Sequence, residues 1–306
     1  MREKVGWAWL SVVIWVLAAI PAVANTGPAP PALISPSGVP VAVLKSAGAG
    51  SHWVMTPCGN EAIVFGGMPL RHVDVVLDPG HGGPIDTGAV ASNGLTEKEV
   101  NLRVAQTAAT MLGARGVATV LTRTGDYATP LGVRANLADT VGAKLLISIH
   151  HNAPLQAPSP VPGVEIFHES NSPESRRLGG LVYERLMTAL STFVVDWVAP
   201  DDAGVMQVLN TSGGDAYGMI RLPETTSVLA ELGYMANPAE ANLFARPVYP
   251  QVAGRAIADA VLDYLETDKP GAGYVQPRVF NPQPGVGRSL CVETGLGEEL
   301  PELGRR

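Results

Sequence analysis

Two histidines in this sequence each mark the end of a short apolar run. His81 follows the run 73–79, His150 closes the run 144–150, and a loop comes after each of them. In an open α/β sheet the carboxyl ends of neighbouring parallel strands share one edge, where His81 and His150 can converge. Glu97 opens a stretch with helical periodicity and can return to the same edge. Imidazole nitrogens and a carboxylate oxygen are ligands that zinc accepts, so these three residues form a candidate zinc site.

The spacing of these residues leaves other interpretations open. A histidine in a buried strand is often a hydrogen-bonded core residue, and Glu97 could serve only as a carboxylate at a helix start. The compact zinc signatures are absent from the sequence. His151 follows His150 directly, and strand alternation points the two in opposite directions. Glu97 and Glu99 point roughly 200° apart on a helix. Only one of the two histidines, and only one of the two glutamates, can therefore face the site.

Glu231 is a further candidate, because it interrupts the apolar run 227–235. A carboxylate in such a run must be paired, bound to metal or kept for acid–base work, since burying it alone is costly. It could instead reach solvent from the end of the strand. Hydrolytic zinc sites combine three protein ligands with a position for water, and a separate carboxylate can accept the proton of that water. Glu231 is therefore the candidate general base.

The elements that must position these residues can be predicted from the apolar pattern. Thr96 is a plausible N-cap of the first helix, with Glu99 placed as in a capping box. The run 163–168 alternates, which favours a more exposed strand than the continuous apolar runs. Strands that alternate with helices predict one α/β domain of three layers, with a mostly parallel or mixed central sheet flanked by helices. The predicted strands are 73–78, 117–122, 144–150, 163–168 and 227–232, and the predicted helices are 97–115, 130–141, 173–191 and 250–266.

The sequence divides into four parts. Residues 1–24 begin with basic residues, continue with an apolar run and end in two small residues separated by one other residue, as at a signal-peptidase cleavage site. This pattern predicts a cleaved signal peptide. An uncleaved membrane anchor is the alternative. Residues 25–71 are a Pro/Ala/Gly-rich extension, whose part 25–50 resembles a flexible or extended linker. We expect residues 72–268 to form the compact domain that carries the candidate catalytic residues, and we expect little regular structure in the tail 269–306.

The two cysteines, Cys58 and Cys291, lie on either side of this domain. In an oxidising compartment such a pair predicts a disulfide that joins the extension to the tail. Two free thiols or a metal pair are the alternatives, and no Cys-x-x-Cys spacing supports the metal pair. The net charge of −7 argues against a nucleic-acid partner. We expect a secreted protein without a stable membrane span once the signal segment is removed.

Several separated motifs resemble one enzyme family. They are DPGHGG, GLTEKEVNL, LTRTGD, a helix containing Arg134, SIHHNA and VLAELGYMANPAE, in that order, between about residues 73 and 266. This order resembles the zinc-dependent N-acetylmuramoyl-L-alanine amidases of bacterial cell walls, the third-type amidase family. The resemblance implies that His81, Glu97 and His150 are the zinc ligands and that Glu231 is the catalytic glutamate. The sequence departs from the family pattern at His151, where a small residue is usual, and at Tyr234, where phenylalanine is usual.

The resemblance also implies a reaction. A secreted enzyme with one zinc ion per chain would hydrolyse the amide between N-acetylmuramic acid and L-alanine of the stem peptide in peptidoglycan. Asn152 and Arg221 are weaker candidates for substrate contacts, because they are equally explained as loop and surface residues. One alternative is another secreted zinc amide hydrolase, such as a carboxypeptidase. A second is a catalytically inactive or latent domain that binds peptidoglycan, and the oligomeric state is unknown.

Overall fold

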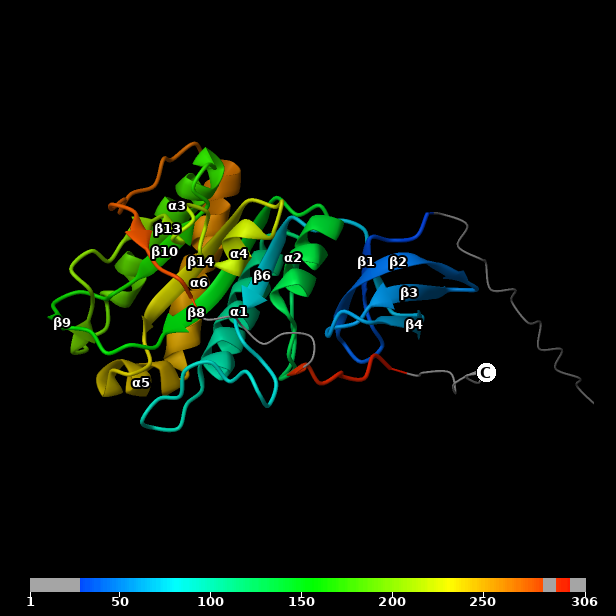
Figure 1. The fold of residues 1–306 in the computed structure, drawn as a ribbon, viewed down its shortest axis with the longest axis horizontal. Coiled ribbons are helices and arrows are strands. Elements are labelled where there is room, and N and C mark those ends of the chain that lie inside the picture. Colours follow the sequence, from blue (N-terminus) through cyan, green and yellow to red (C-terminus); the bar gives the residue numbers. More distant parts are fainter. Residues whose placement is uncertain (1–27, 283–289, 298–306) are drawn as a thin grey trace, which may run out of the picture.

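The computed structural model describes residues 28–282 and 290–297 (Figure 1). The predicted signal peptide, residues 1–24, lies outside this part of the chain. Within the described residues, no helix is both long and apolar enough to cross a membrane.

A six-stranded sheet lies at the centre of the α/β domain, with the strand order β12-β10-β14-β8-β6-β7. Its pairs are parallel except for the antiparallel pair β10–β14. The predicted mostly parallel or mixed sheet is therefore confirmed. The strands are β6 (Val75–Pro79), β7 (Thr119–Leu121), β8 (Leu145–Asn152), β10 (Glu165–His168), β12 (Val205–Met206) and β14 (Ser227–Tyr234).

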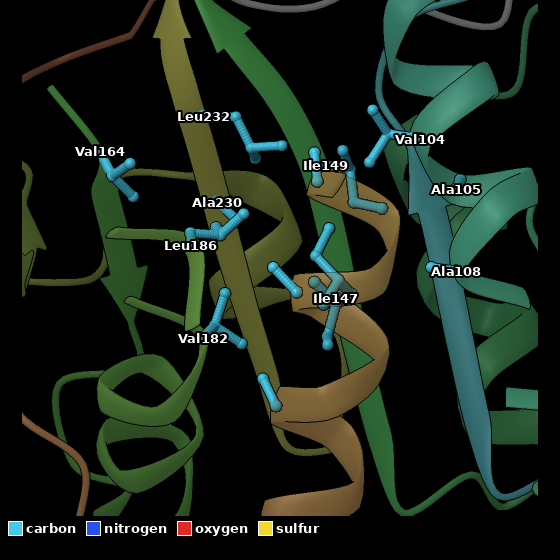
Figure 2. Close-up of a cluster of buried hydrophobic side chains, with 14 of the residues drawn as sticks. Val104, Ala105, Ala108, Ile147, Ile149, Val164, Val182, Leu186, Ala230 and Leu232 are labelled. Atoms are coloured by element: carbon cyan, nitrogen blue, oxygen red, sulfur yellow. The ribbon is translucent and has the colours of Figure 1, made fainter. Parts of the chain in front are cut away.

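Helices cover both faces of this sheet. The larger core lies under α1 (Glu97–Ala114), α3 (Pro173–Leu190) and α6 (Val248–Glu266). Figure 2 shows part of this core, in which side chains of β8 and β14 lie beside those of α1 and α3. The opposite face packs against α2 (Leu131–Thr140) and α4 (Gly218–Arg221). The three predicted layers are thus present.

The predicted ranges agree with the strands and helices that they match to within a few residues, but the exposure of one strand is wrong and several short elements, β12 and α4 among them, were not predicted. Strand β10 is buried along its whole length, so the prediction that the strand at 163–168 is more exposed than the other strands is wrong. The reason is its place inside the sheet, between β14 and β12, with Phe167 stacked on Tyr217. The short helix α5 (Pro238–Ala245) was not predicted, although Asn237 accepts a hydrogen bond at its N-terminus and Pro238 begins it.

The N-terminal extension contains a second sheet, two strands of which lie within 32–48, and this corrects the expectation of a flexible or extended linker at 25–50. Its core consists of alternate residues of short strands, such as Val41, Val54 and Val64, together with Tyr127 and Leu296 from distant parts of the chain. Burial of these side chains holds a Pro- and Gly-rich segment in regular structure. The sheet is antiparallel with the order β4-β3-β2-β1-β5. Its strands are β1 (Ala32–Ile34), β2 (Pro40–Gly48), β3 (Ser51–Met55), β4 (Glu61–Phe65) and β5 (Met68–Leu70).

The C-terminal tail returns to this second sheet. Cys58 and Cys291 form a disulfide, which confirms the predicted pairing. The carboxylate of Glu293 accepts hydrogen bonds from Thr56 and Asn60. Figure 1 shows this end of the chain, in red, beside the blue strands. Two small sheets complete the fold: β9 (Pro158–Ser159) pairs with β11 (Trp197–Val198), and β13 (Val208–Leu209) pairs with β15 (Arg278–Val279).

Candidate active site

Three of the predicted site residues converge at the carboxyl edge of the central sheet. His81 follows β6, His150 lies in the adjacent strand β8, and Glu97 is the first residue of α1. One nitrogen of each histidine and one oxygen of Glu97 all lie within 4.8 Å of one another. The Glu97 Oε1 atom is 3.1 Å from His81 Nε2 and 3.0 Å from His150 Nδ1. The cluster therefore offers two imidazole nitrogens and one carboxylate oxygen from three separate elements.

The neighbouring carboxylate, Glu99, has a different position. It accepts hydrogen bonds from the Thr96 backbone N–H at 3.0 Å and from the Thr96 hydroxyl at 2.7 Å, as in a capping box. Glu97 instead is buried and faces the histidines. The helix periodicity that separates these two residues places Glu97, and not Glu99, in the cluster.

The neighbouring histidine, His151, points away from the cluster into the core. Its Nδ1 atom is 2.7 Å from Asn101 Oδ1, and its Nε2 atom is 2.7 Å from the Tyr249 hydroxyl. Burial lowers the pKa of His151 to about 3, which makes it a neutral core histidine. Strand alternation thus leaves His150 as the residue that faces the site.

Two buried arginines hold the loop that carries His81. This residue has a φ of 62°, in the left-handed region that non-glycine residues rarely occupy. Arg123 donates to the carbonyls of Pro79 and Gly80, each at 3.0 Å. Arg134 donates to the His81 carbonyl at 2.8 Å. These bonds fix the backbone in the unusual conformation that aims the His81 ring at Glu97.

Arg134 also forms a buried ion pair beneath the loop. Its Nη1 atom is 2.8 Å from Asp78 Oδ1, and both side chains are almost wholly shielded from solvent. Asp78 accepts further hydrogen bonds from the hydroxyls of Ser148 and Thr122. Burial alone would raise the pKa of Asp78, but Arg134 and the two hydroxyls outweigh it and hold that pKa below its usual value.

Two glycines give the side chains of the cluster their space. A Cβ atom on Gly80 would lie 2.2 Å from His150 Cε1. A Cβ atom on Gly88 would lie 2.5 Å from Glu97 Oε2 and 2.7 Å from His81 Cδ2. Real Cβ contacts are not that short, so the site needs glycine at both positions.

Polar neighbours orient the cluster and add negative charge. Asp86 Oδ1 is 2.6 Å from His81 Nδ1, which directs the other ring nitrogen toward Glu97. The Ala89 backbone N–H donates to Glu97 Oε2 at 2.9 Å. Burial lowers the pKa of His81, but the carboxylates of Asp86 and Glu97 outweigh this effect and raise it to about 10. The same carboxylates favour a cation at the point where the ring nitrogens converge.

Glu231 lies beside this cluster on β14, where it pairs in register with His150 on β8. It lines a pocket of about 620 Å³ together with His81 and His150. Its Oε2 atom is buried and has no hydrogen-bond partner among the described residues. Burial, followed by the negative charges of Glu97 and Glu165, raises the pKa of Glu231 well above its usual value. An unpaired carboxylate in a pocket suits a group that exchanges a proton with a ligand.

The weaker substrate-contact candidates differ in their positions. Arg221 lines the pocket, and its guanidinium donates to the Ala216 carbonyl at 2.7 Å. Asn152 is not among the residues that line it, and its amide donates to Glu165 Oε2 at 2.9 Å. The other lining residues are Asp86, Ala128, Thr129, Pro130, Leu131, Arg134, Asn210, Ala216, Tyr217, Gly218, Met219, Leu229 and Pro282.

Three residues of the site, Asp86, Arg123 and Glu165, were not among the candidates predicted from the sequence. Glu165 could have been found, because it interrupts an apolar strand just as Glu231 does, and the same cost of burial applies. Asp86 lies five residues after His81 in a glycine-rich loop, and local sequence does not show that the loop folds back.

Comparisons with known proteins find relatives of this chain in sequence and in structure. A family model described as N-acetylmuramoyl-L-alanine amidase matches residues 75–263. The uncharacterized protein YqiI of Bacillus subtilis is 32% identical over 214 residues, which cover 69% of this chain and 92% of that protein. The amidase AmiA of Escherichia coli is 32% identical over 222 residues, covering 62% and 75%. The structure of the amidase AmiC2 of Nostoc punctiforme matches with a TM-score of 0.53 and 30% identity, covering 63% of this chain and 97% of that one.

Proposed function

The chain belongs to the N-acetylmuramoyl-L-alanine amidase family, and we propose that His81, Glu97 and His150 bind the zinc ion with which it hydrolyses peptidoglycan. The bond cleaved is the amide between N-acetylmuramic acid and the L-alanine of the stem peptide. The observation that carries the proposal is the placement of Glu231, whose Oε2 atom has no hydrogen-bond partner among the described residues, in the same pocket as His81 and His150 of the cluster.

The chemistry of the cluster fits zinc. Two imidazole nitrogens and a carboxylate oxygen are one of the ligand sets of catalytic zinc, which keeps a further position for water. Asp86 and the Ala89 N–H orient these ligands, as neighbouring groups do in known zinc sites. When bound, zinc supplies Lewis acidity that lowers the pKa of a water molecule from about 15.7 to about 7 and polarises a carbonyl. We expect one zinc ion per chain.

Glu231 is the proposed general base. It is close enough to the cluster to share its pocket, and its Oε2 atom is free of hydrogen bonds from the described residues. In the proposed mechanism this oxygen takes a proton from the attacking water and then passes it to the leaving amine of L-alanine. Arg221 lines the same pocket, and we propose that it contacts a polar group of the substrate. For Asn152 the same role would require its amide to leave Glu165.

The disulfide and the cell-wall amidase family both indicate an extracytoplasmic protein. We further infer that residues 1–24 direct export and are then removed, because their sequence has the pattern of a signal peptide. Sequencing of the N-terminus of the exported protein would test this inference.

A digestion of defined muropeptides tests the proposed reaction. The chain 25–306 should release intact stem peptides with a free L-alanine amino group. A chelator should stop the release, and added zinc should restore it. Release of single amino acids from the other end of the peptide would instead indicate a carboxypeptidase. Binding of peptidoglycan without any release would indicate a catalytically inactive domain.

A further inference from the structure

A segment of the C-terminal tail forms part of the active-site wall. Strand β15, which begins at Arg278, pairs with β13, and Pro282 lines the pocket that contains Glu231. The ring of Phe280 lies 6.0 Å from that of Tyr217, another lining residue. The family model matches residues 75–263, so this segment of the tail lies outside the matched residues.

Arg278 is the residue of this segment with the strongest polar contacts. Its Nη1 atom is 2.7 Å from Glu165 Oε1, and its Nε and Nη2 atoms are 3.0 Å and 2.6 Å from the Asp202 carboxylate. The two partners differ in their surroundings, because the side chain of Glu165 is 2% exposed and that of Asp202 is 54% exposed. Solvent screens the contact with Asp202, while the contact with Glu165 balances a buried charge.

Glu165 in turn links the two strands that carry His150 and Glu231. Its Oε2 atom accepts hydrogen bonds from the Asn152 amide at 2.9 Å and from the Tyr234 hydroxyl at 2.6 Å. Asn152 is the last residue of β8, and Tyr234 is the last residue of β14. The pairing of these strands shifts register between Glu231 and Tyr234. The Glu165 carboxylate thus joins the strand ends where the backbone ladder is irregular.

We propose that Arg278 is a positioning residue for the reaction, acting through Glu165 to hold the ends of β8 and β14 and thereby His150 and Glu231. This inference rests on the proposed function. Without Arg278 the Glu165 carboxylate is buried with two neutral donors and no counter-charge, an arrangement that is costly and relaxes by movement of the groups around it. A displacement of about 1 Å in a catalytic group can cost about 10²-fold in rate.

Three variants of the full mature chain test the proposal. Arg278→Ala should lower kcat about 10- to 100-fold with KM within about threefold and zinc still bound, because the groups are displaced rather than lost. Arg278→Lys keeps the charge near Glu165 and should recover most of kcat. Asp202→Asn is the matched control, since it weakens the other contact of the same guanidinium and should leave kcat within about twofold.

Hydrogen exchange gives a second measurement that does not depend on turnover. In Arg278→Ala the amides at the ends of 145–152 and 227–235 should exchange faster than in the wild type, and in Asp202→Asn they should not. The double variant Arg278→Ala/Glu165→Gln removes the unbalanced charge, so it should be more active than Arg278→Ala and should fold if the single variant does not.

Equal losses in Arg278→Ala and Asp202→Asn would overturn the proposal, because they would show that Arg278 only tethers the tail. Unchanged exchange in Arg278→Ala, or a double variant no better than the single one, would overturn it as well. A wild-type chain that binds zinc but cleaves no muropeptide would defeat the proposed function. In that event the difference in amide hydrogen exchange between Arg278→Ala and Asp202→Asn still decides whether Arg278 holds the strand ends.

Discussion

The site contains two carboxylates, one in the cluster and one in the pocket beside it, and their hydrogen bonds separate their roles. Glu97 is held by the Ala89 N–H and lies beside both histidines of the cluster. Glu231 Oε2 has no partner among the residues described by the structure. A carboxylate fixed by several donors suits a ligand, whereas one with a free oxygen suits proton transfer.

This contrast predicts a separation of metal binding from catalysis. Glu231→Gln should retain about one zinc per chain, because Glu231 is outside the ligand cluster, but should lower kcat about 10²- to 10⁴-fold through loss of the base. Zinc content by atomic absorption and muropeptide turnover measure the two effects. Glu99→Gln is the control, since its carboxylate only caps α1, and its turnover should stay close to that of the wild type. Near-normal turnover in Glu231→Gln would remove Glu231 from the mechanism.

At the scale of elements, Asp78 joins four parts of the fold beneath the loop that carries His81. It lies one residue before the end of β6 and accepts hydrogen bonds from Thr122 after β7, Ser148 in β8 and Arg134 in α2. Arg134 connects Asp78 to the loop, because its guanidinium also donates a hydrogen bond to the His81 carbonyl. The stability of this region therefore depends on the charge of one buried carboxyl group.

The pKa of Asp78 gives this dependence a direction. The pKa of Asp78 in the folded state is lowered from 3.8. The ion pair with Arg134 therefore stabilises the fold fully above about pH 4, and that stabilisation is lost as the pH falls through the lower folded-state pKa. Asp78→Asn leaves Arg134 buried without a counter-charge and should lower the free energy of unfolding by about 3–5 kcal/mol at pH 7. Urea unfolding should show that this difference from the wild type is constant above about pH 4 and shrinks below it. The exposed Asp201→Asn is the control. A difference that grows in acid would contradict the assignment.

Local patterns were enough to predict the elements that carry the site. The apolar runs placed His81 and His150 at strand ends, and the capping pattern at Thr96 and Glu99 placed Glu97 at the start of α1. These features depend on residues within one or two helical turns of each other, or within a single strand. They also explain why neighbouring residues on the same element face in different directions.

Contacts between distant residues could not be predicted in the same way. The core of the N-terminal sheet is completed by Tyr127 and Leu296, so the strand pattern of 32–70 was hidden behind its Pro- and Gly-rich composition. The partner of Glu165 is Arg278, which lies 113 residues away in a tail where little structure was expected. Local periodicity carries no information about which buried charge meets which distant cation.

At the scale of the whole molecule, the C-terminal tail is attached near the pocket and again at the N-terminal sheet. Near the pocket it is held by the pairing of β15 with β13 and by Arg278. Beyond that it is held to the N-terminal sheet by the Cys58–Cys291 disulfide and by burial of Leu296. The first attachment contacts residues of the site. The second contacts a sheet whose residues do not line the pocket, and it touches the pocket lining only where Cys291 Sγ lies 3.6 Å from the Ala128 carbonyl.

Removal of the disulfide should therefore affect stability more than chemistry. The bond joins residues 233 positions apart, and Cys58→Ser/Cys291→Ser should lower the free energy of unfolding by about 2–4 kcal/mol through the greater freedom of the unfolded chain. At a temperature where both proteins are folded, kcat should stay within about twofold, because β15 and Arg278 keep their own contacts. Thermal unfolding and muropeptide turnover of the two proteins check both parts. A large rise in turnover would instead show that the disulfide keeps the enzyme latent, and a large fall would show that the pocket depends on the distant attachment.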